Sequence, residues 1–300
     1  MEAWLDTEFW AGSLLRTDEY KLARDSAETR PLNLDWTLAR NESVELRQRL
    51  FRAFVTLGWS RARVTLGRQR MAWGTGYAWN PTDLLNPFNP GAIELGERAG
   101  VDALHGTLSL GPTSQVEVVI AAPERFGDPS YAARAGTNVR EYDVSLMAGH
   151  FGDRYAIGGD FAGYLGGGGL RGETALVHPS NDEPYVRAIL NADYTFARGI
   201  YSLVEVYFNG KGGLAAGEAF GSERWYAAGS LASPLSPLVA VSVYGLINLS
   251  DGSALCGPAV TTSLTQGLEL TANVYFFAGR SDTEFGIQRH AVFASLQWYY

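Results

Sequence analysis

The stretch from residue 44 to residue 73 constrains the fold more than any other part of the sequence. It contains two runs in which apolar residues recur at spacings of two, joined at Gly58-Trp59-Ser60. A period of two predicts extended strands, so the two runs predict a hairpin. No water-soluble core would accept many guanidinium groups, whereas a barrel with an apolar outside and a wet interior would. The arginines in question are Arg47, Arg49, Arg52, Arg61, Arg63, Arg68 and Arg70.

The rest of the chain shows the same alternation, for example in the segment 268–276. A soluble β-sandwich would show it too, so alternation alone does not decide the fold class. Segment length does, because many extended segments reach about ten residues, the length that a tilted strand needs to cross a bilayer. No stretch approaches the roughly 18 consecutive apolar residues of a transmembrane helix. We therefore predict one domain, residues 1–300, with an all-β fold: a transmembrane antiparallel up-and-down β-barrel.

The number of strands follows from the lengths of the connections. A membrane barrel of this kind has an even number of strands, with short turns at one end and long loops at the other. Short turns near 58–60, 111–113, 150–153, 196–199, 232–237 and 265–267 then alternate with long connections at 16–31, 74–98, 123–137, 164–184 and 210–221. This predicts about fourteen strands, if 32–57 is one long strand and Leu170–Val177 belongs to an outer hairpin. Sixteen strands are the alternative, if both segments span the membrane.

The segment 74–98 is rich in Pro, Asn and aromatic residues, which favours a loop folded into the barrel. If this acidic loop faces the arginine hairpin, the field across a narrow water channel would orient solutes and filter ions. The alternative is that the arginines lie at the membrane rim or pair with nearby acids as scaffold. Arg63 and Arg68 could share a face only if Gly67 marks a bulge. The predicted constriction residues are Arg47, Arg49, Arg63, Arg68, Arg70, Asp83, Glu94, Glu97 and Asp102, and the predicted lumen-wall residues are His105, Arg187, Asp193, Glu205 and Glu269.

Several short segments resemble a known group. The run LGRQRMAWGTGYAWNPTDLLNP is similar to the strand-to-loop segment of porin-like outer-membrane proteins, in which a G-R-Q…W-G strand end precedes P-x-D and N-P. The segments DYTF, EVYFNG and NLSDGS resemble the same group. The chain end, with Val292, Leu296, Trp298 and Tyr300 in alternation, resembles the aromatic C-terminal strand of bacterial outer-membrane barrels. The resemblance implies a barrel and passive solute passage, and it supplies no substrate or catalytic residue.

These features predict a channel in the bacterial outer membrane, with its signal peptide removed, surrounded by lipid and lipopolysaccharide. Small hydrophilic solutes would diffuse through a water-filled, arginine-lined lumen narrowed by the 74–98 loop. The alternative is a structural barrel that sheathes or anchors a partner, such as an exported polymer, a surface protein or an electron-transfer complex. Association with a partner protein or with further copies of the chain stays open.

Other functions find little support in the sequence. The net charge of −8 argues against nucleic acid as a partner. The four histidines are dispersed, without metal-ligand spacing, and no Ser or Asp adjoins a His in a recognisable motif. We therefore predict no enzymatic activity, no metal and no cofactor. Cys256 is the single cysteine, so no intrachain disulfide forms.

Overall fold

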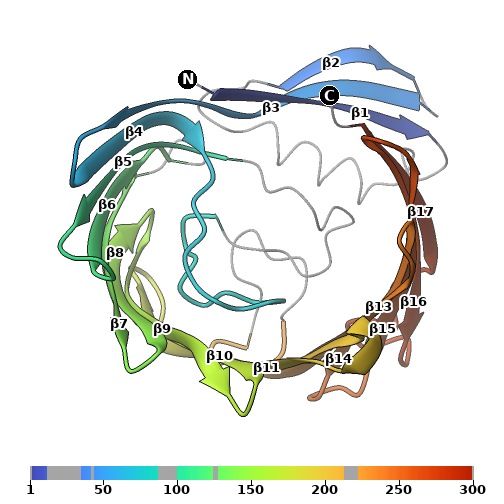
Figure 1. Cartoon of the computed structure of the whole chain (residues 1–300). Coiled ribbons are helices and arrows are strands. Elements are labelled where there is room, and N and C mark those ends of the chain that lie inside the picture. The colour runs from blue at the N-terminus through green and yellow to red at the C-terminus, as the bar shows by residue number, and fades with distance from the viewer. Residues whose placement is uncertain are drawn as a thin grey trace.

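The computed structural model describes residues 2–11, 35–41, 44–86, 100–123, 128–212 and 222–298. They form a 17-stranded sheet whose neighbouring strands are antiparallel, and the strands follow one another around a ring in which β17 approaches β1 (Figure 1). The predicted all-β barrel class is confirmed. The strands are β1 (Glu2–Ala11), β2 (Asp35–Arg40), β3 (Val44–Gly58), β4 (Ala62–Gln69), β5 (Val101–Ser109), β6 (Gln115–Ala121), β7 (Ser130–Val139), β8 (Tyr142–Phe151), β9 (Arg154–Leu165), β10 (Gly168–Pro179), β11 (Tyr185–Thr195), β12 (Tyr201–Asn209), β13 (Trp225–Ser236), β14 (Val239–Asn248), β15 (Ala254–Thr265), β16 (Leu268–Ala278) and β17 (Ala291–Trp298).

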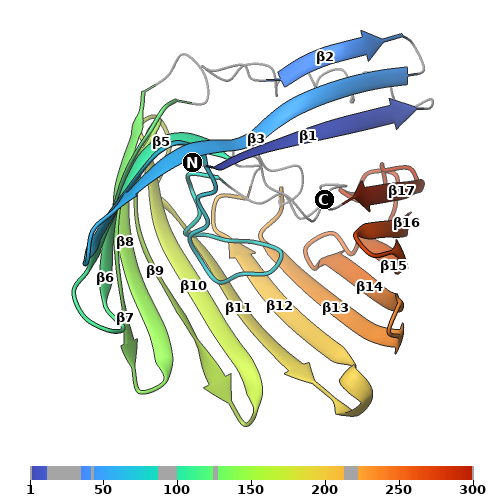
Figure 2. The same cartoon turned by 45° about the horizontal axis from the view of Figure 1, so that its top comes forward.

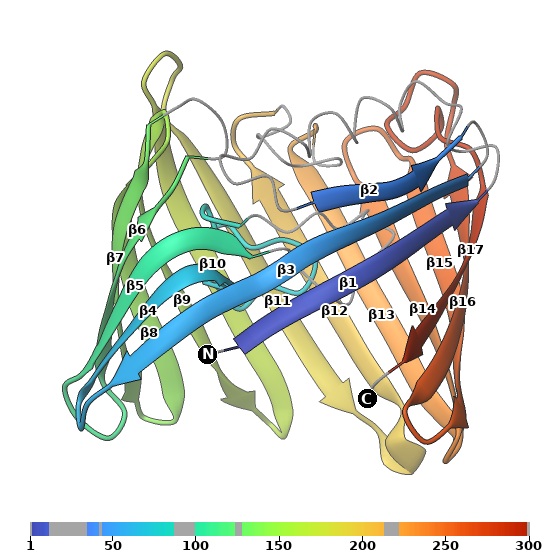
Figure 3. The same cartoon turned by 90° about the horizontal axis from the view of Figure 1, so that it is seen from above.

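The N-terminal strands are arranged around β3, which is 15 residues long and crosses the barrel wall obliquely (Figure 3). One edge of β3 pairs with β1, from Glu2 opposite Phe54 onwards. The other edge pairs first with β2, where Asp35 lies opposite Arg49, and then with β4, beginning at Ala53. β2 and β4 therefore share one edge of β3, with a break at positions 50–52 between their described pairings.

The sheet has three more strands than the fourteen predicted. The predicted single strand at 32–57 is divided into β2 and β3, the predicted loop at 123–137 contains most of β7, and the predicted outer hairpin around Leu170–Val177 is part of β10. β7 and β10 are rich in glycine and alanine in both alternating sets, so their period of two is weak. β7 is an additional strand, so it reverses the direction in which β8 and β9 run. The turn at 152–153, which was predicted among the short turns, therefore lies at the end of the barrel that carries the long connections. β10 is a second additional strand and reverses the direction once more. The turns that follow it therefore lie at the ends of the barrel at which they were predicted.

Tight turns join consecutive strands at one end of the barrel (Figure 3). Arg140 and Glu141 between β7 and β8 have φ of 50° and 71°, and Gly166 and Gly167 between β9 and β10 have 60° and 84°. Two consecutive left-handed residues give the turn twist that matches a hairpin. Between β11 and β12 lies a 3-10 turn, η2 (Ala197–Gly199). No helix in the described part of the chain has the length and apolar character needed to cross a membrane.

Alternate residues of each strand face opposite sides of the sheet. On one side, residues such as Tyr207 and Tyr244 pack into buried clusters inside the barrel, and we call these positions the inner register. The alternate positions form the outer register. There Val274 of β16 lies opposite Val292 of β17, and Val292 and Trp298 are 76% and 74% exposed. Apolar side chains of these strands therefore point away from the barrel axis, as the alternation predicts.

The outer register has the character of a surface that faces lipid. From β6 to β17 its described positions contain no Asp, Glu, Lys or Arg. Aromatic residues lie at both ends of this surface, as in the interfacial girdles of membrane barrels. The aromatic residues are Tyr131, Tyr155, Phe208, Trp225 and Phe276 toward the long connections, and Tyr142, Tyr194 and Trp298 toward the tight turns.

Candidate functional site

The chain that follows β4 enters the barrel (Figure 2). Its described part, residues 70–86, is called the inserted loop below. Met71, Trp73 and Leu85 pack in a buried cluster with the inner register of β5–β11. Ala78 and Trp79 pack in a second cluster with the inner register of β11–β16. The inserted loop therefore lies between two parts of the wall and occupies part of the interior.

Glu173 of β10 binds the first turn of the inserted loop. Its carboxylate accepts hydrogen bonds from the backbone N–H groups of Thr75 and Gly76. Thr82 donates two more, from its N–H at 3.2 Å and from its hydroxyl at 2.9 Å. The loop can come this close because Gly74 has no side chain, since a Cβ there would lie 2.6 Å from Glu173 Oε2.

Glu205 of β12 binds the next turn in the same manner. Its Oε1 accepts the N–H groups of Ala78 and Trp79, both at 3.0 Å, and its Oε2 accepts that of Tyr77 at 2.7 Å. Asn191 of β11 also donates to Oε2, from Nδ2 at 3.0 Å. Consecutive backbone N–H groups aimed at one anion form a binding concavity, and a hydrogen bond to a charged group contributes about 1.5–3 kcal/mol. The two glutamates thus fix the inserted loop to the strands β10–β12.

Trp79 adds an apolar contact to the same wall and is 1% exposed. Its ring stacks on Tyr207, with centroids 4.8 Å apart and planes at 15°, and lies 5.5 Å from the ring of Tyr226. Arg187 donates from Nε to the Tyr207 hydroxyl at 2.7 Å, and its guanidinium lies 5.5 Å from the centre of that ring. Such aromatic pairs contribute about 0.5–1.5 kcal/mol beyond the area they bury. The middle of the inserted loop is therefore held by both hydrogen bonds and packing.

A second connection, residues 279–290 between β16 and β17, meets the same aromatic group. Glu284 accepts hydrogen bonds from the Tyr226 hydroxyl at 2.6 Å and from Asn248 Nδ2 at 2.8 Å. Phe285 is fully buried in the cluster that contains Trp79. Tyr226 therefore contacts the inserted loop through its ring and the second connection through its hydroxyl.

The turn between β14 and β15 supports this second connection. Asp251 accepts the N–H of Glu284 at 2.8 Å, and both the N–H and the hydroxyl of Ser253 at 2.7 Å. Burial alone would raise the pKa of the Asp251 carboxyl, but these hydrogen bonds and the positive charge of Arg280 outweigh it and lower that pKa. Ser253 in turn accepts the N–H of Phe285 at 3.2 Å. Asp251 is therefore an ionised anchor at neutral pH.

Charged side chains of the inner register on β5–β9 are joined into one chain of contacts. Glu117 lies between His105 at 3.0 Å and Arg134 at 3.3 Å. Arg134 also contacts Asp160 at 3.2 Å and donates to the Ser145 hydroxyl at 3.0 Å. These side chains therefore bind one another across β5–β9.

The predicted lumen-wall residues all lie in the inner register. Asp193 pairs with Arg171 of β10. Glu269 is half-buried opposite Gln297 and has no ion pair among the described residues. These residues are His105, Arg187, Asp193, Glu205 and Glu269. Glu205 binds the inserted loop, and Arg187 binds Tyr207, on which Trp79 of the loop stacks.

The predicted constriction arginines are spread over several environments. Arg47 is buried and pairs with Glu45 at 2.7 Å. Arg63 is exposed in the inner register, and Arg70 is exposed just beyond β4. Gly67 has φ of 124°, but β4 pairs residue for residue with β3 and β5, so alternation continues past it. Arg63 and Arg68 therefore lie on opposite faces of the sheet; the side chain of Arg49 lies outside the described structure.

The acidic half of the predicted constriction is only partly described. Asp83 is buried in the inserted loop and accepts the N–H of Asn86 at 3.2 Å, as a turn-forming Asp does. Glu94 and Glu97 lie outside the described residues. Within the described residues, the inserted loop is bound to the wall through the carboxylates of Glu173 and Glu205, which accept hydrogen bonds from its backbone N–H groups.

Arg68 and Asp102 are brought together in the outer register. Val101 and Ala103 pack with the inner cluster, so Asp102 between them points the other way. Arg68 binds its carboxylate through Nε and Nη2, both at 2.9 Å, and is 2% exposed. Its Nη1 donates to the carbonyl oxygen of Leu50 at 3.2 Å, within the break between β2 and β4. The guanidinium thus satisfies a backbone acceptor where the sheet lacks a strand.

Three important residues were not singled out from the sequence. Glu173 lies in the glycine-rich segment whose alternation is weak, and Trp79 and Glu284 lie in connections without a period. The one local signal was the Gly74-Thr75-Gly76 run, because two glycines beside an aromatic residue permit close backbone approach to a wall.

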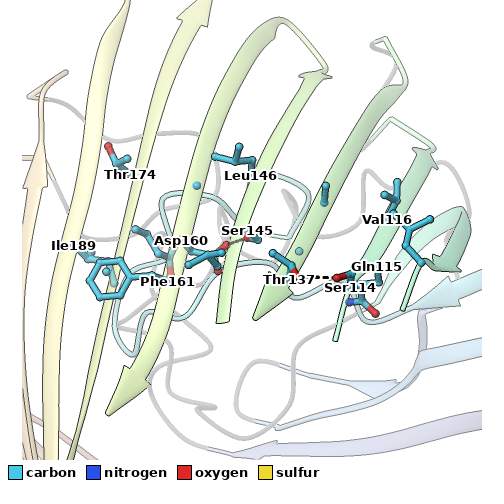
Figure 4. A pocket seen from close by; sticks show the side chains of 17 residues that line it. Ser114, Gln115, Val116, Thr137, Ser145, Leu146, Asp160, Phe161, Thr174 and Ile189 are labelled. Atoms are coloured by element: carbon cyan, nitrogen blue, oxygen red, sulfur yellow. Dashed lines mark hydrogen bonds between the residues drawn. The ribbon is translucent and has the colours of Figure 1, made fainter. Parts of the chain in front are cut away.

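A hollow of about 900 Å³ lies over β6–β10. The side chains of Val116, Leu146 and Phe161 border it, and a hydrogen bond of 2.7 Å between Ser114 and Thr137 closes one side (Figure 4). Val116, Thr137, Leu146 and Phe161 belong to the outer register, whereas Gln115, Ser145 and Asp160, which also line the hollow, belong to the inner register. The hollow is therefore bordered by residues of both registers of the wall.

No protein-family model matches the sequence, and no characterised protein matches it in sequence either. Solved structures share the fold. OprD, an outer-membrane protein of Pseudomonas aeruginosa, matches with a TM-score of 0.60 and 11% identity over 86% of this chain and 79% of its own. OccD3 (OpdP) of the same organism matches at 0.52 and 12%, over 78% and 74%. Wzi of Escherichia coli, a carbohydrate-binding β-barrel involved in capsule assembly, matches at 0.56 and 9%, over 77% and 67%.

Proposed function

We propose that this protein is a channel of the bacterial outer membrane, through which small hydrophilic solutes diffuse past the inserted loop. The observation that carries the proposal is the inserted loop itself, held across the interior by Glu173 and Glu205. Glu173 and Glu205 lie in the middle of β10 and β12. A loop that covered only the rim of the barrel would not reach carboxylates at that depth. An outer face that carries no Asp, Glu, Lys or Arg at its described positions from β6 to β17, and that has aromatic bands, supports insertion in lipid, and the fold likeness to OprD and OccD3 supports the outer membrane.

The proposal gives roles to the charged residues around the lumen. Arg63 and Arg70, which are exposed, would provide the positive part of the lumen lining, and Glu269 a negative part. Lipid and lipopolysaccharide would cover the outer register, and export to this membrane would require a signal peptide that is later removed. No step of the proposed function is catalytic.

Conductance of single molecules in a planar bilayer tests the proposal. Replacement of residues 75–82 by a short Gly-Ser linker should raise the conductance about two- to fivefold, because it removes the segment that Glu173 and Glu205 bind. The control is a linker of the same kind in the 180–184 connection between β10 and β11, which should leave the conductance unchanged. An absence of conductance in both the wild type and the variant without the loop would refute the channel.

A closed barrel that anchors a partner is the second candidate. The dense packing of Trp79, Tyr226 and Phe285 favours it, because these buried side chains fill space that a wide pore would need. The likeness to Wzi agrees with it, since that barrel binds carbohydrate. A wild-type protein that never conducts, but that copurifies with a polymer or a protein, would establish this second function.

A further inference from the structure

The lumen wall on the side of the tight turns differs between its two halves. On β5–β11 the charges are largely bound to one another, through the contacts of Arg134 with Glu117 and Asp160 and of Arg171 with Asp193. An ion that used one of these groups would have to separate it from its partner, which is costly for partly buried pairs. This half of the wall therefore offers few free charges to a passing solute.

The other half, on β13–β17, is lined by small polar side chains. Thr261, Thr271 and Ser295 lie side by side in one inner-register row across β15, β16 and β17. The hydroxyl oxygens of Thr261 and Thr271 are 3.0 Å apart. Ser242 of β14 is exposed in the same register, and Gln297 follows Ser295 along β17. We call Ser242, Thr261, Thr271, Ser295 and Gln297 the hydroxyl face.

Charges without an ion pair are scattered in the described inner register. Arg63 on β4, Asp143 on β8 and Glu269 on β16 are separated around the barrel and differ in sign. Glu173 and Glu205 also have no ion pair among the described residues, but the inserted loop occupies both carboxylates. Selective ion pores instead concentrate rings of charged side chains of one sign. The described wall therefore lacks the arrangement that would favour one ion strongly.

Hydroxyl and amide groups both donate and accept hydrogen bonds, so they can replace water around a solute that has many hydroxyls. Aromatic rings beside them provide flat apolar surface. Tyr77 of the inserted loop is 42% exposed, and its ring lies 6.2 Å from that of Tyr244, on the strand that carries Ser242. Phe293 lies two residues from Ser295 on β17. The hydroxyl face is thus bordered by aromatic side chains on two sides.

From this arrangement we infer that the preferred solutes are neutral and polyhydroxylated, of the sugar or polyol type, and that they pass along the hydroxyl face. This inference rests on the proposed channel function and adds the class of solute. The hydroxyl face lowers the cost of desolvating such a solute. The paired charges opposite offer an ionised solute no free partner, and Glu269, which lies opposite Gln297 at the edge of the hydroxyl face, is a single charge and not a ring of charges.

Solute flux into proteoliposomes tests the inference, with a neutral hexose, the hexuronate and the amino-hexose of the same ring as probes. Wild-type protein should pass the hexose about three- to tenfold faster than either charged sugar. The double variant Thr261→Val/Thr271→Val removes both hydroxyls of one hydrogen-bonded pair, so no hydroxyl remains whose partner has been removed. It should lower hexose flux about three- to tenfold while the KCl conductance stays within about a fifth of the wild-type value.

Thr262→Val is the matched control, because Thr262 lies on the same strand in the outer register, opposite Val239 and Leu270. It should leave hexose flux unchanged. Faster passage of the hexuronate or the amino-hexose, or equal hexose flux in the double variant and in Thr262→Val, would overturn the inference and leave the channel intact. An absence of KCl conductance in the wild type would instead refute the channel itself, and the inference with it.

Discussion

Replacing Glu205 by Gln tests how the inserted loop is held. The carboxylate accepts three backbone N–H groups and the Asn191 amide through its two oxygens. Glutamine has the same shape but only one acceptor oxygen. If that oxygen keeps the N–H groups of Ala78 and Trp79, the side-chain NH₂ faces the N–H of Tyr77, which then has no acceptor.

The magnitude follows from these contacts. The variant loses one or two charge-assisted hydrogen bonds and leaves a backbone donor unpaired, which together cost about 2–4 kcal/mol. Because 1.4 kcal/mol corresponds to a tenfold change in an equilibrium constant, the equilibrium between the docked and the undocked loop shifts by roughly 30- to 700-fold toward the undocked state. The effect should stay local, because the strand pairing of β12 with β11 and β13 does not depend on the carboxylate.

Amide hydrogen exchange of the protein in detergent measures this shift directly, because protection reports the free energy of local opening. The N–H groups of residues 77–79 should exchange faster by about the same factor in Glu205→Gln. The control Glu269→Gln makes the same change in the inner register, at a residue that forms no hydrogen bond or ion pair with the described part of the loop. If residues 77–79 exchange at equal rates in the wild type and both variants, the carboxylate does not hold the loop and the reasoning is wrong.

Three further predictions concern other contacts. Trp79→Ala should lower the free energy of unfolding by about 3–5 kcal/mol, because it empties a buried aromatic site; denaturant unfolding in detergent measures this, and Trp225→Ala in the outer register should cost less. Arg68→Lys should destabilise by about 1–3 kcal/mol, because lysine cannot bind Asp102 through two nitrogens and also reach the Leu50 carbonyl; equal unfolding midpoints for this variant and the wild type would contradict it. The lowered pKa of Asp251 means that its stabilising contribution is complete above its ordinary pKa of 3.8 and is lost as the pH falls through the lower, folded value; exchange at the N–H of Glu284 should therefore show extra opening only below about pH 4, and Asp251→Asn should remove that pH dependence.

The strand count shows where local sequence patterns lose information. β8, β11, β14 and β16 alternate clearly between apolar and polar residues, and their predicted positions are close to the observed ones. β7 and β10 carry alanine and glycine at many positions of both registers, so a period of two is hardly visible in them. They are strands because β6, β8, β9 and β11 supply hydrogen-bonding partners on both of their edges.

The predicted site residues also fall into two groups, those whose face follows from a local pattern and those whose face depends on pairing between strands. The register of His105, Arg187, Asp193, Glu205 and Glu269 could be predicted, because it depends only on alternation within a strand. The face of Arg68 could not, because it depended on whether Gly67 interrupted the pairing with both neighbouring strands. Its pairing with Asp102 and Leu50 further depends on the break between β2 and β4, which no local pattern records.

By itself, the amino-acid sequence determined which side of the sheet most residues face, that the wall is apolar outside and polar inside, and that a loop near residue 74 enters the barrel. These properties are local, because a period of two and a cluster of Pro, Gly and aromatic residues can be recognised within a few positions. The tertiary structure decided what the loop meets: Thr75 bonds to Glu173 and Tyr77 to Glu205, 98 and 128 positions away in the chain. Such contacts exist only once the strands curl into a ring, because the curvature of the sheet places β10–β12 across the interior from β4.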